Sequence, residues 1–402
     1  MTGRAVLIIV WLLLSAVCAS ADAAFDRWLQ SVWPDAQALG VSRATFDAAV
    51  RGLEPDFSLP DLAIPGKPEK QPQQPEFVQT PAQYLRETAF QAYTSRGKEL
   101  AAQHRDTLAR IEKEIGVPGK ILLAIWARES GFSREFRGQD AIRVLATQAY
   151  IGKRKDFFRN EFLHALKMLQ DGVPRSDLRS SWGGAMGLTQ FLPSEFYKYA
   201  VDFDGDGRID IWRSVPDALA SAAKQLAGKG WRAGEPWAIE VHAPANADCS
   251  MGVPEVIKPV SEWIKLGFVP ANGRKLSAAE LSLDASLLQP EGSYGPSFLA
   301  PRNYFVLKDY NFSDLYVLFV GHLSDRIAGG RPFEMPWSKN AQLKTAQVET
   351  MQQRLTALGL YKDKIDGKAG MLTRAALGAY QKKNGLKVDC WPTDAVLDHM
   401  RR

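Results

Sequence analysis

Apolar residues recur at helical spacing through most of the chain, and this pattern is what most restricts its fold. Helical patterns run with short breaks from Pro81 to about Leu226, and another is expected from Ser313 to Ala328, whereas Val-rich segments typical of strands are scarce. Spacings of three and four residues place apolar side chains on one face of a helix. Residues 235–300 are instead rich in Pro, Gly and Ala and are predicted to be irregular. The sequence therefore predicts a mainly α-helical protein.

The first 23 residues differ from the rest. Arg4 precedes an apolar run over 5–17 that contains one serine, and small residues of the kind found at cleavage sites follow it. We expect 1–23 to be a signal peptide and the mature protein to be periplasmic or secreted, because no later stretch approaches the roughly 20 apolar residues of a membrane span. Cys18 could carry a lipid, but the three residues before it form a poor lipobox, which argues against an outer-membrane lipoprotein.

The C-terminal part of the chain is predicted to be a separate basic module. A large domain is predicted over 24–336, and the sequence Gly-Gly-Arg-Pro at 329–332 lies close to its end. Residues 337–343 are predicted to be a linker that separates this domain from 344–402. Residues 344–402 contain 11 Lys and Arg against 6 Asp and Glu, so they carry the whole net charge of +5. Three short helices are expected there. An anionic polymer is the expected partner, although a solvated basic face would give the same charge.

Glu129 is the residue that most suggests catalysis. It follows the apolar part of ILLAIWARESG and shares a helix face with Trp126, while Gly131 is a suitable C-terminal cap. The carboxylate would therefore lie in the last turn, at the negative end of the helix dipole. Burial and the dipole both predict a raised pKa, as a general acid requires. An ion pair with Arg128 or Arg134 at a frayed helix end is the structural alternative.

A second motif, SSWGGAMGLTQFLPS, occupies 180–194. Its glycines remove side chains from a turn, so that another backbone or a flat ligand can approach closely. Ser181 and Gln190 offer hydroxyl and amide groups of the kind that bind sugar hydroxyls and N-acetyl groups. A tight turn between helices with polar caps is the alternative interpretation.

A third motif, DFDGDGRID, is similar to the start of a calcium-binding loop. Asp202, Asp204, Asp206 and Asp210 occupy positions 1, 3, 5 and 9 of an EF-hand-type loop, and Arg208 offers a carbonyl at position 7. Position 12 is an arginine instead of the expected glutamate, and an aspartate four residues later could replace it or cap the next helix. Close carboxylates repel each other unless they are neutralised, which predicts a structural calcium or sodium ion. A solvated Asp-Gly turn is the alternative.

Together these motifs resemble the membrane-bound lytic murein transglycosylase B family. ARESGF, DAIRVLATQAY, GAMGLTQFLPS and VDFDGDGRIDIWRSVPDALAS occur in the order and at the spacing of that family. The resemblance implies a lysozyme-like helical catalytic domain over 24–336 that cleaves the MurNAc–GlcNAc β-1,4 bond of peptidoglycan without a cofactor. One departure is Lys224-Gln225, where the family often has Asn-Tyr, so one aromatic sugar contact is in doubt.

The resemblance also assigns roles to residues. Glu129 matches the family's catalytic acid. Five further positions correspond to substrate-contacting or basic positions: Arg154, Ser181, Gln190, Asn303 and Tyr310. One carboxylate is enough for this reaction, whereas most glycosidases need two. Glu129 would protonate the glycosidic oxygen and then remove the proton of the C6 hydroxyl, which attacks C1 and leaves a 1,6-anhydroMurNAc end.

The segment from Val348 to Leu386 is similar to a peptidoglycan-binding three-helix module, which implies such a domain over 344–402. The expected partner is the peptidoglycan glycan strand, with no nucleic acid, and a monomer is expected. A hydrolytic muramidase and a non-catalytic cell-wall-binding protein are the alternatives; the former needs a second carboxylate opposite Glu129.

Other classes of chemistry have no support in the sequence. It contains no P-loop, HExxH or G-x-S-x-G motif, and its five histidines are scattered. After signal-peptide cleavage Cys249 and Cys390 remain. An exported protein permits a disulfide between them, and two unpaired thiols fit the sequence equally well.

Overall fold

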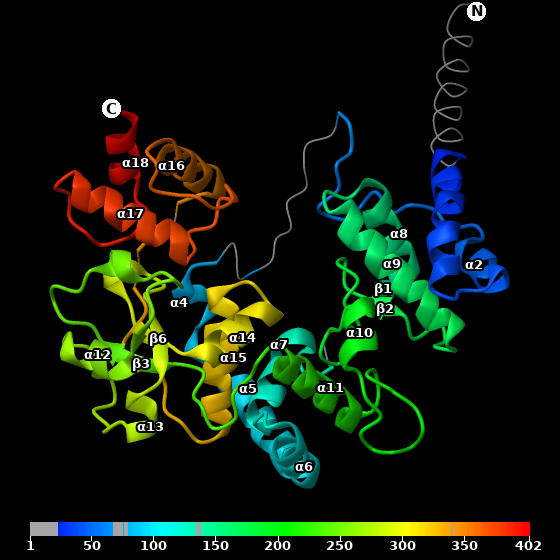
Figure 1. The fold of residues 1–402 in the computed structure, drawn as a ribbon, viewed down its shortest axis with the longest axis horizontal. Coiled ribbons are helices and arrows are strands. Elements are labelled where there is room, and N and C mark those ends of the chain that lie inside the picture. The colour runs from blue at the N-terminus through cyan, green and yellow to red at the C-terminus, as the bar shows by residue number, and fades with distance from the viewer. Residues whose placement is uncertain (1–22, 67–74, 76–78, 134–137, 339, 342) are drawn as a thin grey trace, which may run out of the picture. The chain divides into compact units, whose positions relative to one another are not determined.

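The computed structural model is mainly helical, as predicted (Figure 1). It describes every residue except 1–22, 67–74, 76–78, 134–137, 339 and 342. The predicted signal peptide, including Cys18, therefore lies outside the described residues except for its last residue. The chain forms two compact units, each assembled from two separate stretches. Unit 1 comprises Met1–Pro72 and Glu129–Ser221, and unit 2 comprises Gln73–Arg128 and Ala222–Arg402.

Unit 1 is built from helices around one apolar core. Its elements are a helix over 23–38, α2 (Arg43–Val50), β1 (Gln139–Asp140), α8 (Ala141–Ile151), α9 (Lys155–Gln170), β2 (Arg179–Ser180) and α10 (Pro193–Tyr199). α9 packs against α2, α8 and α10. Phe46, Phe158 and Phe162 are fully buried at the centre of this core. Burial of such apolar surface, at roughly 25 cal/mol per Å², is the main stabilising contribution.

Unit 2 begins with a helical layer. Its helices outside the C-terminal module are α4 (Pro81–Tyr84), α5 (Glu87–Gln103), α6 (Arg105–Ile115), α12 (Val260–Lys265), α13 (Ala278–Leu281), α14 (Arg302–Tyr310) and α15 (Asp314–Ile327). α15 confirms the helix expected over 313–328 and packs against α5, where Arg326 and Glu87 form an ion pair of 2.7 Å. Two of the three unit boundaries fall within α7 (Gly119–Ser130) and α11 (Val215–Gly228). Among the described residues, no helix combines the length and apolarity needed to cross a membrane.

The prediction that 235–300 is irregular was wrong. This segment carries an antiparallel sheet in the order β4-β6-β7-β3-β5. The strands are β3 (Ile239–His242), β4 (Lys258–Pro259), β5 (Val269–Pro270), β6 (Asp284–Leu288) and β7 (Ser297–Ala300). Trp263 and Phe268 are buried in the apolar cluster that this sheet forms with α12. Both edge strands contain proline, which cannot donate to a further strand.

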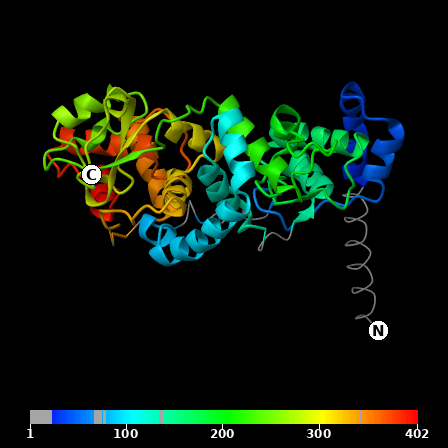
Figure 2. The ribbon, with the colours of Figure 1, turned by 90° about the horizontal axis from the view of Figure 1, so that it is seen from below.

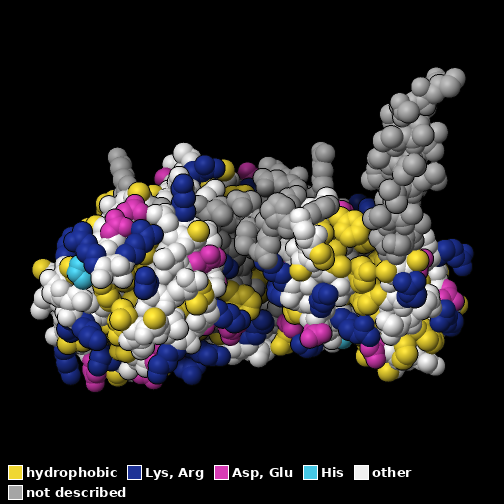
Figure 3. All heavy atoms as spheres, turned by 90° about the horizontal axis from the view of Figure 1, so that it is seen from above, with side chains coloured by type: hydrophobic (Ala, Val, Ile, Leu, Met, Phe, Trp, Pro, Cys, Tyr) yellow, Lys and Arg dark blue, Asp and Glu magenta, His cyan; other side chains and the backbone are white. Residues whose placement is uncertain are grey.

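The C-terminal module contains the three expected helices, α16 (Thr345–Ala357), α17 (Met371–Lys383) and α18 (Asp394–Arg401). They enclose a small apolar core that includes Met351, Leu355, Leu377 and Leu397. In Figures 1 and 2 these orange and red helices lie beside the yellow-green segment that carries the sheet. Figure 3 shows Lys and Arg side chains in several groups over the face drawn there.

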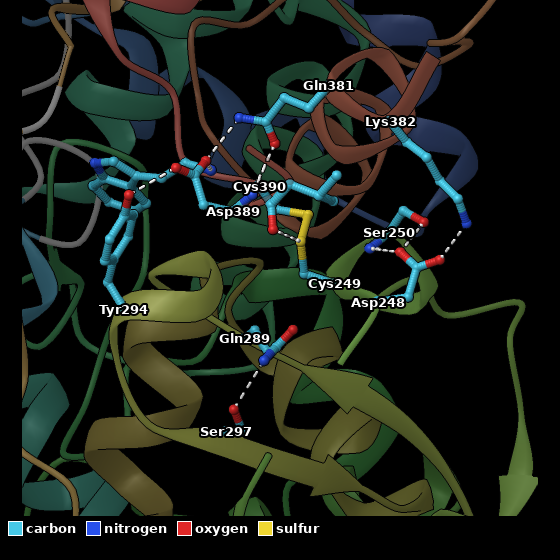
Figure 4. The surroundings of a disulfide bond; sticks show 12 residues. Asp248, Cys249, Ser250, Gln289, Tyr294, Ser297, Gln381, Lys382, Asp389 and Cys390 are labelled. Atoms are coloured by element: carbon cyan, nitrogen blue, oxygen red, sulfur yellow. Dashed lines mark hydrogen bonds and ion pairs between the residues drawn. A yellow bond between two sulfur atoms is a disulfide. The ribbon is translucent and has the colours of Figure 1, made fainter. Parts of the chain in front are cut away.

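The predicted linker 337–343 is not the only connection between the module and the rest of unit 2, and its role as a linker stays a prediction. Cys249, in the short helix η1 (Cys249–Met251), forms a disulfide with Cys390 of the module, and their Cα atoms are 6.1 Å apart (Figure 4). Within the predicted linker, the Ser338 N–H donates to Glu291 at 2.6 Å, and the Ala341 carbonyl accepts from Trp391 Nε1 at 3.2 Å. The two cysteines are thus paired, and their disulfide fixes the module to the rest of unit 2.

Polar contacts and close backbone packing surround this disulfide (Figure 4). Lys382 pairs with Asp248 at 3.0 Å, and the Tyr294 hydroxyl donates to Asp389 Oδ2 at 2.7 Å. Gly292 has φ 59°, and a Cβ atom there would lie 1.9 Å from the Asp389 carbonyl oxygen. Only glycine permits this approach. The surfaces of the module and of the rest of unit 2 are therefore fitted to each other.

Replacing Cys249 and Cys390 together by Ser is expected to lower the free energy of unfolding by about 2–4 kcal/mol, because the crosslink spans a sequence separation of 141 residues and restricts the unfolded chain. Urea unfolding of the variant and of the oxidised wild-type protein measures this difference. Reductant should shift the wild-type transition and leave the double variant unchanged. Equal unfolding free energies for oxidised wild type and double variant would contradict the expected stabilisation.

Candidate functional site

Glu129 lies in the last turn of α7, as predicted. The preceding helical residues are almost entirely buried, including Trp126, which is 5% exposed. Glu129 itself is partly exposed. A carboxyl group in this position is accessible to a ligand, yet it is attached to a rigid, buried helix. This is an arrangement in which a side chain can be held in a fixed orientation towards a substrate.

The end of α7 is tied to the glycine-rich turn of the second motif. The Ser130 hydroxyl donates to the Leu188 carbonyl at 2.8 Å, and Ser130 is 4% exposed. The next three residues, Gly131, Phe132 and Ser133, all have positive φ, at 57°, 57° and 68°. For the two that are not glycine this backbone is unfavourable and persists only where surrounding contacts enforce it. Ser130 was missed at the sequence level, although it adjoins Glu129 directly.

Ser181 and Gln190 lie in one tight turn, and this turn also contains Leu188. The Ser181 hydroxyl accepts from the Ala185 N–H at 3.3 Å, and Gln190 Nε2 donates to the Gly187 carbonyl at 3.0 Å. Both side chains are partly exposed, and Gln190 has φ 55°. The structure therefore brings the Ser181–Gln190 turn to the helix end that carries Glu129.

Two of the three glycines in this turn are needed for close packing against other parts of the protein. Gly184 has φ 86°, and a Cβ atom there would lie 2.3 Å from Leu145 Cδ2. Gly187 has φ 75°, and its Cβ would lie 2.7 Å from the Ile211 carbonyl oxygen. At Gly183 a Cβ would meet nothing closer than 3.9 Å. The predicted close approach is confirmed for Gly184 and Gly187, and the groups that approach belong to the protein itself.

Arg154 lies at the N-terminal cap of α9, also in unit 1. Its guanidinium is 3.2 Å from Asp61 and lies over the ring of Phe158, 4.8 Å from the ring centroid. The side chain remains 52% exposed. An exposed ion pair of this kind stabilises a protein by only about 0–1 kcal/mol, so the guanidinium remains accessible for an anionic or polar ligand.

Asn303 and Tyr310 lie on α14 in unit 2. Asn303 is fully buried, and its amide accepts from the Arg232 N–H and donates to the carbonyls of Arg232 and Glu235. As placed, it supports the 232–235 turn, and a substrate contact from it stays a prediction. Tyr310 is partly exposed and its ring stacks on Tyr316 at 6.4 Å. The other assigned residues belong to unit 1: Glu129, Arg154, Ser181 and Gln190.

The acidic loop between α10 and α11 gathers three carboxylates, those of Asp202, Asp204 and Asp217, whose oxygen atoms lie within 4.8 Å of one another. Asp217 is 1% exposed and accepts backbone N–H groups from Phe203, Asp204 and Asp210 at 2.7, 3.2 and 2.9 Å. Asp217 was expected either to replace the missing glutamate of position 12 or to cap the next helix, and its carboxylate thus faces the loop.

The other predicted ligands have different partners. The carboxylates of Asp206 and Asp210 lie outside the three-carboxylate group. Asp206 accepts from the Arg208 N–H at 2.8 Å. Asp210 accepts from the N–H groups of Trp212 and Arg213. Arg213, at position 12, forms an ion pair with Asp177 at 2.6 Å, and the hydrogen bond from Arg213 lowers the pKa of Asp177. Asp202, Asp204 and Asp217 are therefore close enough to share a cation, while binding by this group or by the larger set stays a prediction.

If this loop binds calcium, a chelator should lower the melting temperature and added calcium should restore it, because a ligand that binds only the folded state stabilises it by mass action. The measurement is a thermal melt with chelator, with calcium and with magnesium. Asp202→Asn, which removes one charge from the group, should reduce the calcium response. Asp363→Asn, which removes a charge from the C-terminal module, is the control and should keep it. Melts that do not differ between chelator and calcium would leave the loop as a plain turn.

Two family models match the chain. The first, described as "Transglycosylase SLT domain", matches residues 24–325, and the second, described as "Putative peptidoglycan binding domain", matches residues 344–400. The first match covers well over half of the chain. The chain belongs to the SLT-domain lytic transglycosylase family. This confirms the resemblance found in the sequence, with a C-terminal peptidoglycan-binding module and a mainly α-helical, lysozyme-like fold.

Solved structures of relatives agree with this assignment. SltB3 from Pseudomonas aeruginosa, in complex with NAG-anhNAM-pentapeptide, is 38% identical, with a TM-score of 0.84 over 94% of this chain and 99% of that one. Slt35 from Escherichia coli, in complex with calcium, is 28% identical with a TM-score of 0.52, over 62% of this chain and 77% of that one.

A curated relative is also similar in sequence. Membrane-bound lytic murein transglycosylase B of Escherichia coli (strain K12) is 30% identical over 236 residues, which are 57% of this chain. The chain spans 62% of the length of that relative.

Proposed function

We propose that this protein is an exported lytic transglycosylase that cleaves the MurNAc–GlcNAc β-1,4 bond of peptidoglycan and leaves 1,6-anhydroMurNAc ends. The observation that carries the proposal is the placement of Glu129: a single carboxyl group at the end of a buried helix, joined through Ser130 to the turn with Ser181 and Gln190. SltB3 has been solved with both NAG-NAM-pentapeptide and NAG-anhNAM-pentapeptide. These two ligands differ as the substrate and the product of this reaction would.

In this mechanism Glu129 acts twice. As an acid it protonates the glycosidic oxygen as the bond to C1 breaks, which releases the GlcNAc hydroxyl. As the resulting carboxylate it accepts the proton of the C6 hydroxyl, whose oxygen bonds to C1 and closes the anhydro ring. Glu129 ends the cycle protonated, and no water is consumed. Because the nucleophile belongs to the same sugar, its effective concentration is high without a bound water.

The other assigned residues would bind and orient the sugars. Ser181 and Gln190 present a hydroxyl and an amide beside the Glu129 helix end, and such groups donate to and accept from N-acetyl groups and hydroxyls. Arg154 adds an accessible cation on the same unit. Ser130 holds the last turn of α7 and so acts as a positioning residue for Glu129. A fixed acid in this arrangement typically contributes about 10²–10⁴-fold to rate.

Hydrolytic muramidase activity would require a second carboxylate that activates water. Two buried carboxylates of unit 1 already have other partners. Glu161 is 1% exposed and accepts from the N–H and the hydroxyl of Ser194 at 2.9 and 2.7 Å, which anchors the start of α10. Asp217 accepts three backbone N–H groups in the acidic loop. These bonds give Glu161 and Asp217 structural roles, which argues against either of them as the second catalytic carboxylate.

Mass spectrometry of the products released from purified peptidoglycan sacculi tests the proposal. Anhydro ends, lighter by one water than reducing ends, are expected. Reducing ends would assign the hydrolytic reaction, and the absence of products with continued binding would assign a non-catalytic wall-binding protein. We also propose a periplasmic or secreted monomer with the glycan strand as its partner; size-exclusion chromatography with light scattering tests the monomer.

A further inference from the structure

A groove of about 340 Å³ runs between the C-terminal module and the α14–α15 region, within unit 2. We call it the junction groove; its lining includes Lys308, Phe312, Asp314, Asp363, Asp366 and Arg374. We propose that the junction groove binds sugar rings of the peptidoglycan strand, with Phe312 as the ring on which a sugar stacks. The choice of strand rests on the proposed function, while the site itself is argued from the groove.

Phe312 is the first observation. Phe312 lies between α14 and α15, is 81% exposed to solvent, and borders the junction groove. Among the described residues it is the most exposed large apolar side chain; Ile257 follows at 59%. A single exposed apolar side chain is common on proteins, but Phe312 also lines a groove, where its ring is placed to contact a ligand. A flat aromatic ring offers its face to the C–H groups that a pyranose ring presents on one side.

The floor of the groove holds polar groups that neutralise one another. Asp314 accepts from Lys308 at 2.5 Å, from Arg374 at 3.0 Å and from the Tyr304 hydroxyl at 2.6 Å. The side chains of Asp314 and Arg374 are 9% and 8% exposed. Lys308 and Arg374 are already paired with Asp314, so these two cations are weak sites for an anion; Lys368 is a further, exposed cation in the lining. A neutral, hydroxyl-rich ligand suits such a surface better than a carboxylate does.

The module contributes acceptors on the other side of the groove. Asp363 and Asp366 are exposed carboxylates, and Asp366 Oδ1 is oriented by Gln352 Nε2 and by the Lys368 N–H, each at 3.0 Å. Carboxylates accept hydrogen bonds from sugar hydroxyls. They repel the carboxylates of peptide stems, which favours the glycan over the stem as the occupant. The volume also lies within the usual range of about 300–1,000 Å³ for small-ligand sites.

Neither half of unit 2 forms this site alone. Phe312 and Lys308 come from the part before the module, whereas Asp363 and Asp366 belong to the module. The disulfide between Cys249 and Cys390 and the Arg374–Asp314 ion pair hold the two sides together. The peptidoglycan-binding surface therefore extends beyond residues 344–400, to which the module's family match is confined.

Binding to glycan strands from which the peptides have been removed tests the proposal. Every protein carries Glu129→Gln so that the strands stay intact. Phe312→Ala should weaken binding about tenfold, the effect of losing roughly 1.4 kcal/mol. Phe57→Ala is the matched control, since Phe57 is an aromatic residue with 46% exposure that lies in unit 1. It should bind as the parent does, and both variants should melt at the parent temperature.

Equal binding of Phe312→Ala and of the parent protein would overturn the groove assignment. It would also be overturned if the parent protein bound intact sacculi but not stripped strands, because the occupant would then be the peptide stem. Neither outcome bears on the proposed transglycosylase reaction, because that reaction is tested by mass spectrometry of the products of the enzyme with Glu129. Conversely, normal strand binding through Phe312 without anhydro products would leave the groove standing and remove the proposed function. Repeating the binding in high salt should keep the Phe312 difference, because stacking is not screened.

Discussion

Replacing Glu129 by Gln is expected to abolish cleavage of peptidoglycan while the fold is retained. The amide is nearly the same size as the carboxyl group but cannot donate the proton that the departing oxygen needs. Loss of the general acid and of the base that follows it should lower the rate by about 10³-fold or more. The measurement is the release of soluble fragments from sacculi, together with circular dichroism and a thermal melt to verify the fold.

A matched control is Glu99→Gln on α5. Glu99 is also a glutamate in a helix, but its side chain is 65% exposed and pairs with Arg96 on the surface. This variant should cleave at the wild-type rate. Residual activity of Glu129→Gln above about a tenth of wild type would be inconsistent with a general acid, and the catalytic role would then have to belong to another residue.

Replacing Asp314 by Ala is expected to lower the free energy of unfolding by about 3–5 kcal/mol, because removal of one partner leaves buried charge uncompensated. Lys308 and Arg374 would then share a nearly buried site without a counter-charge. Arg374 belongs to α17, so the contact between the module and α15 should weaken as well. Urea unfolding measures the change. Asp47→Ala, which breaks an exposed pair with Arg43, should cost no more than about 1 kcal/mol.

The same residue predicts a dependence on pH. Burial would raise the pKa of Asp314, but the two cations outweigh it and hold the pKa well below its usual range. The folded state therefore binds fewer protons than the unfolded state, whose carboxyl pKa is about 3.9. The contribution of Asp314 is complete above that pH and is lost as pH falls below it. Wild type should lose more stability than Asp314→Ala between about pH 5 and pH 3; parallel losses would contradict the ion pair.

The helices of this protein could be predicted from its sequence because their apolar residues recur on one face. The sheet could not, and its composition explains why. β6 and β7 are buried on both faces over almost their full length, so they lack the alternation that marks a half-exposed strand. The outer strands contain Pro259 and Pro270, residues that normally argue against a strand. Proline is tolerated there only because each lies at an edge.

The site was predictable to a similar extent. The position of Glu129 followed from its spacing relative to Trp126, and the turn that carries Ser181 and Gln190 followed from its glycines. The bond between Ser130 and Leu188 could not be inferred, because it joins residues 58 positions apart. The disulfide spans a still longer separation, of 141 residues. The local pattern of a sequence does not reveal contacts between residues so far apart along the chain. The family resemblance indicated which residues belong to the site but not how they are arranged.

The division of both units into separate stretches of chain imposes an order on how this protein matures. Unit 1 is interrupted by Gln73–Arg128, and unit 2 is completed only by residues up to Arg402. A nascent chain that ends before Leu188 contains Glu129 but lacks the turn that holds the helix of Glu129. Cys249 can form its disulfide only after Cys390 has been synthesised. Contacts between such distant residues form slowly. The candidate site is therefore assembled late, after most of the chain has been synthesised, and a fragment truncated from the C-terminal end would lack the disulfide.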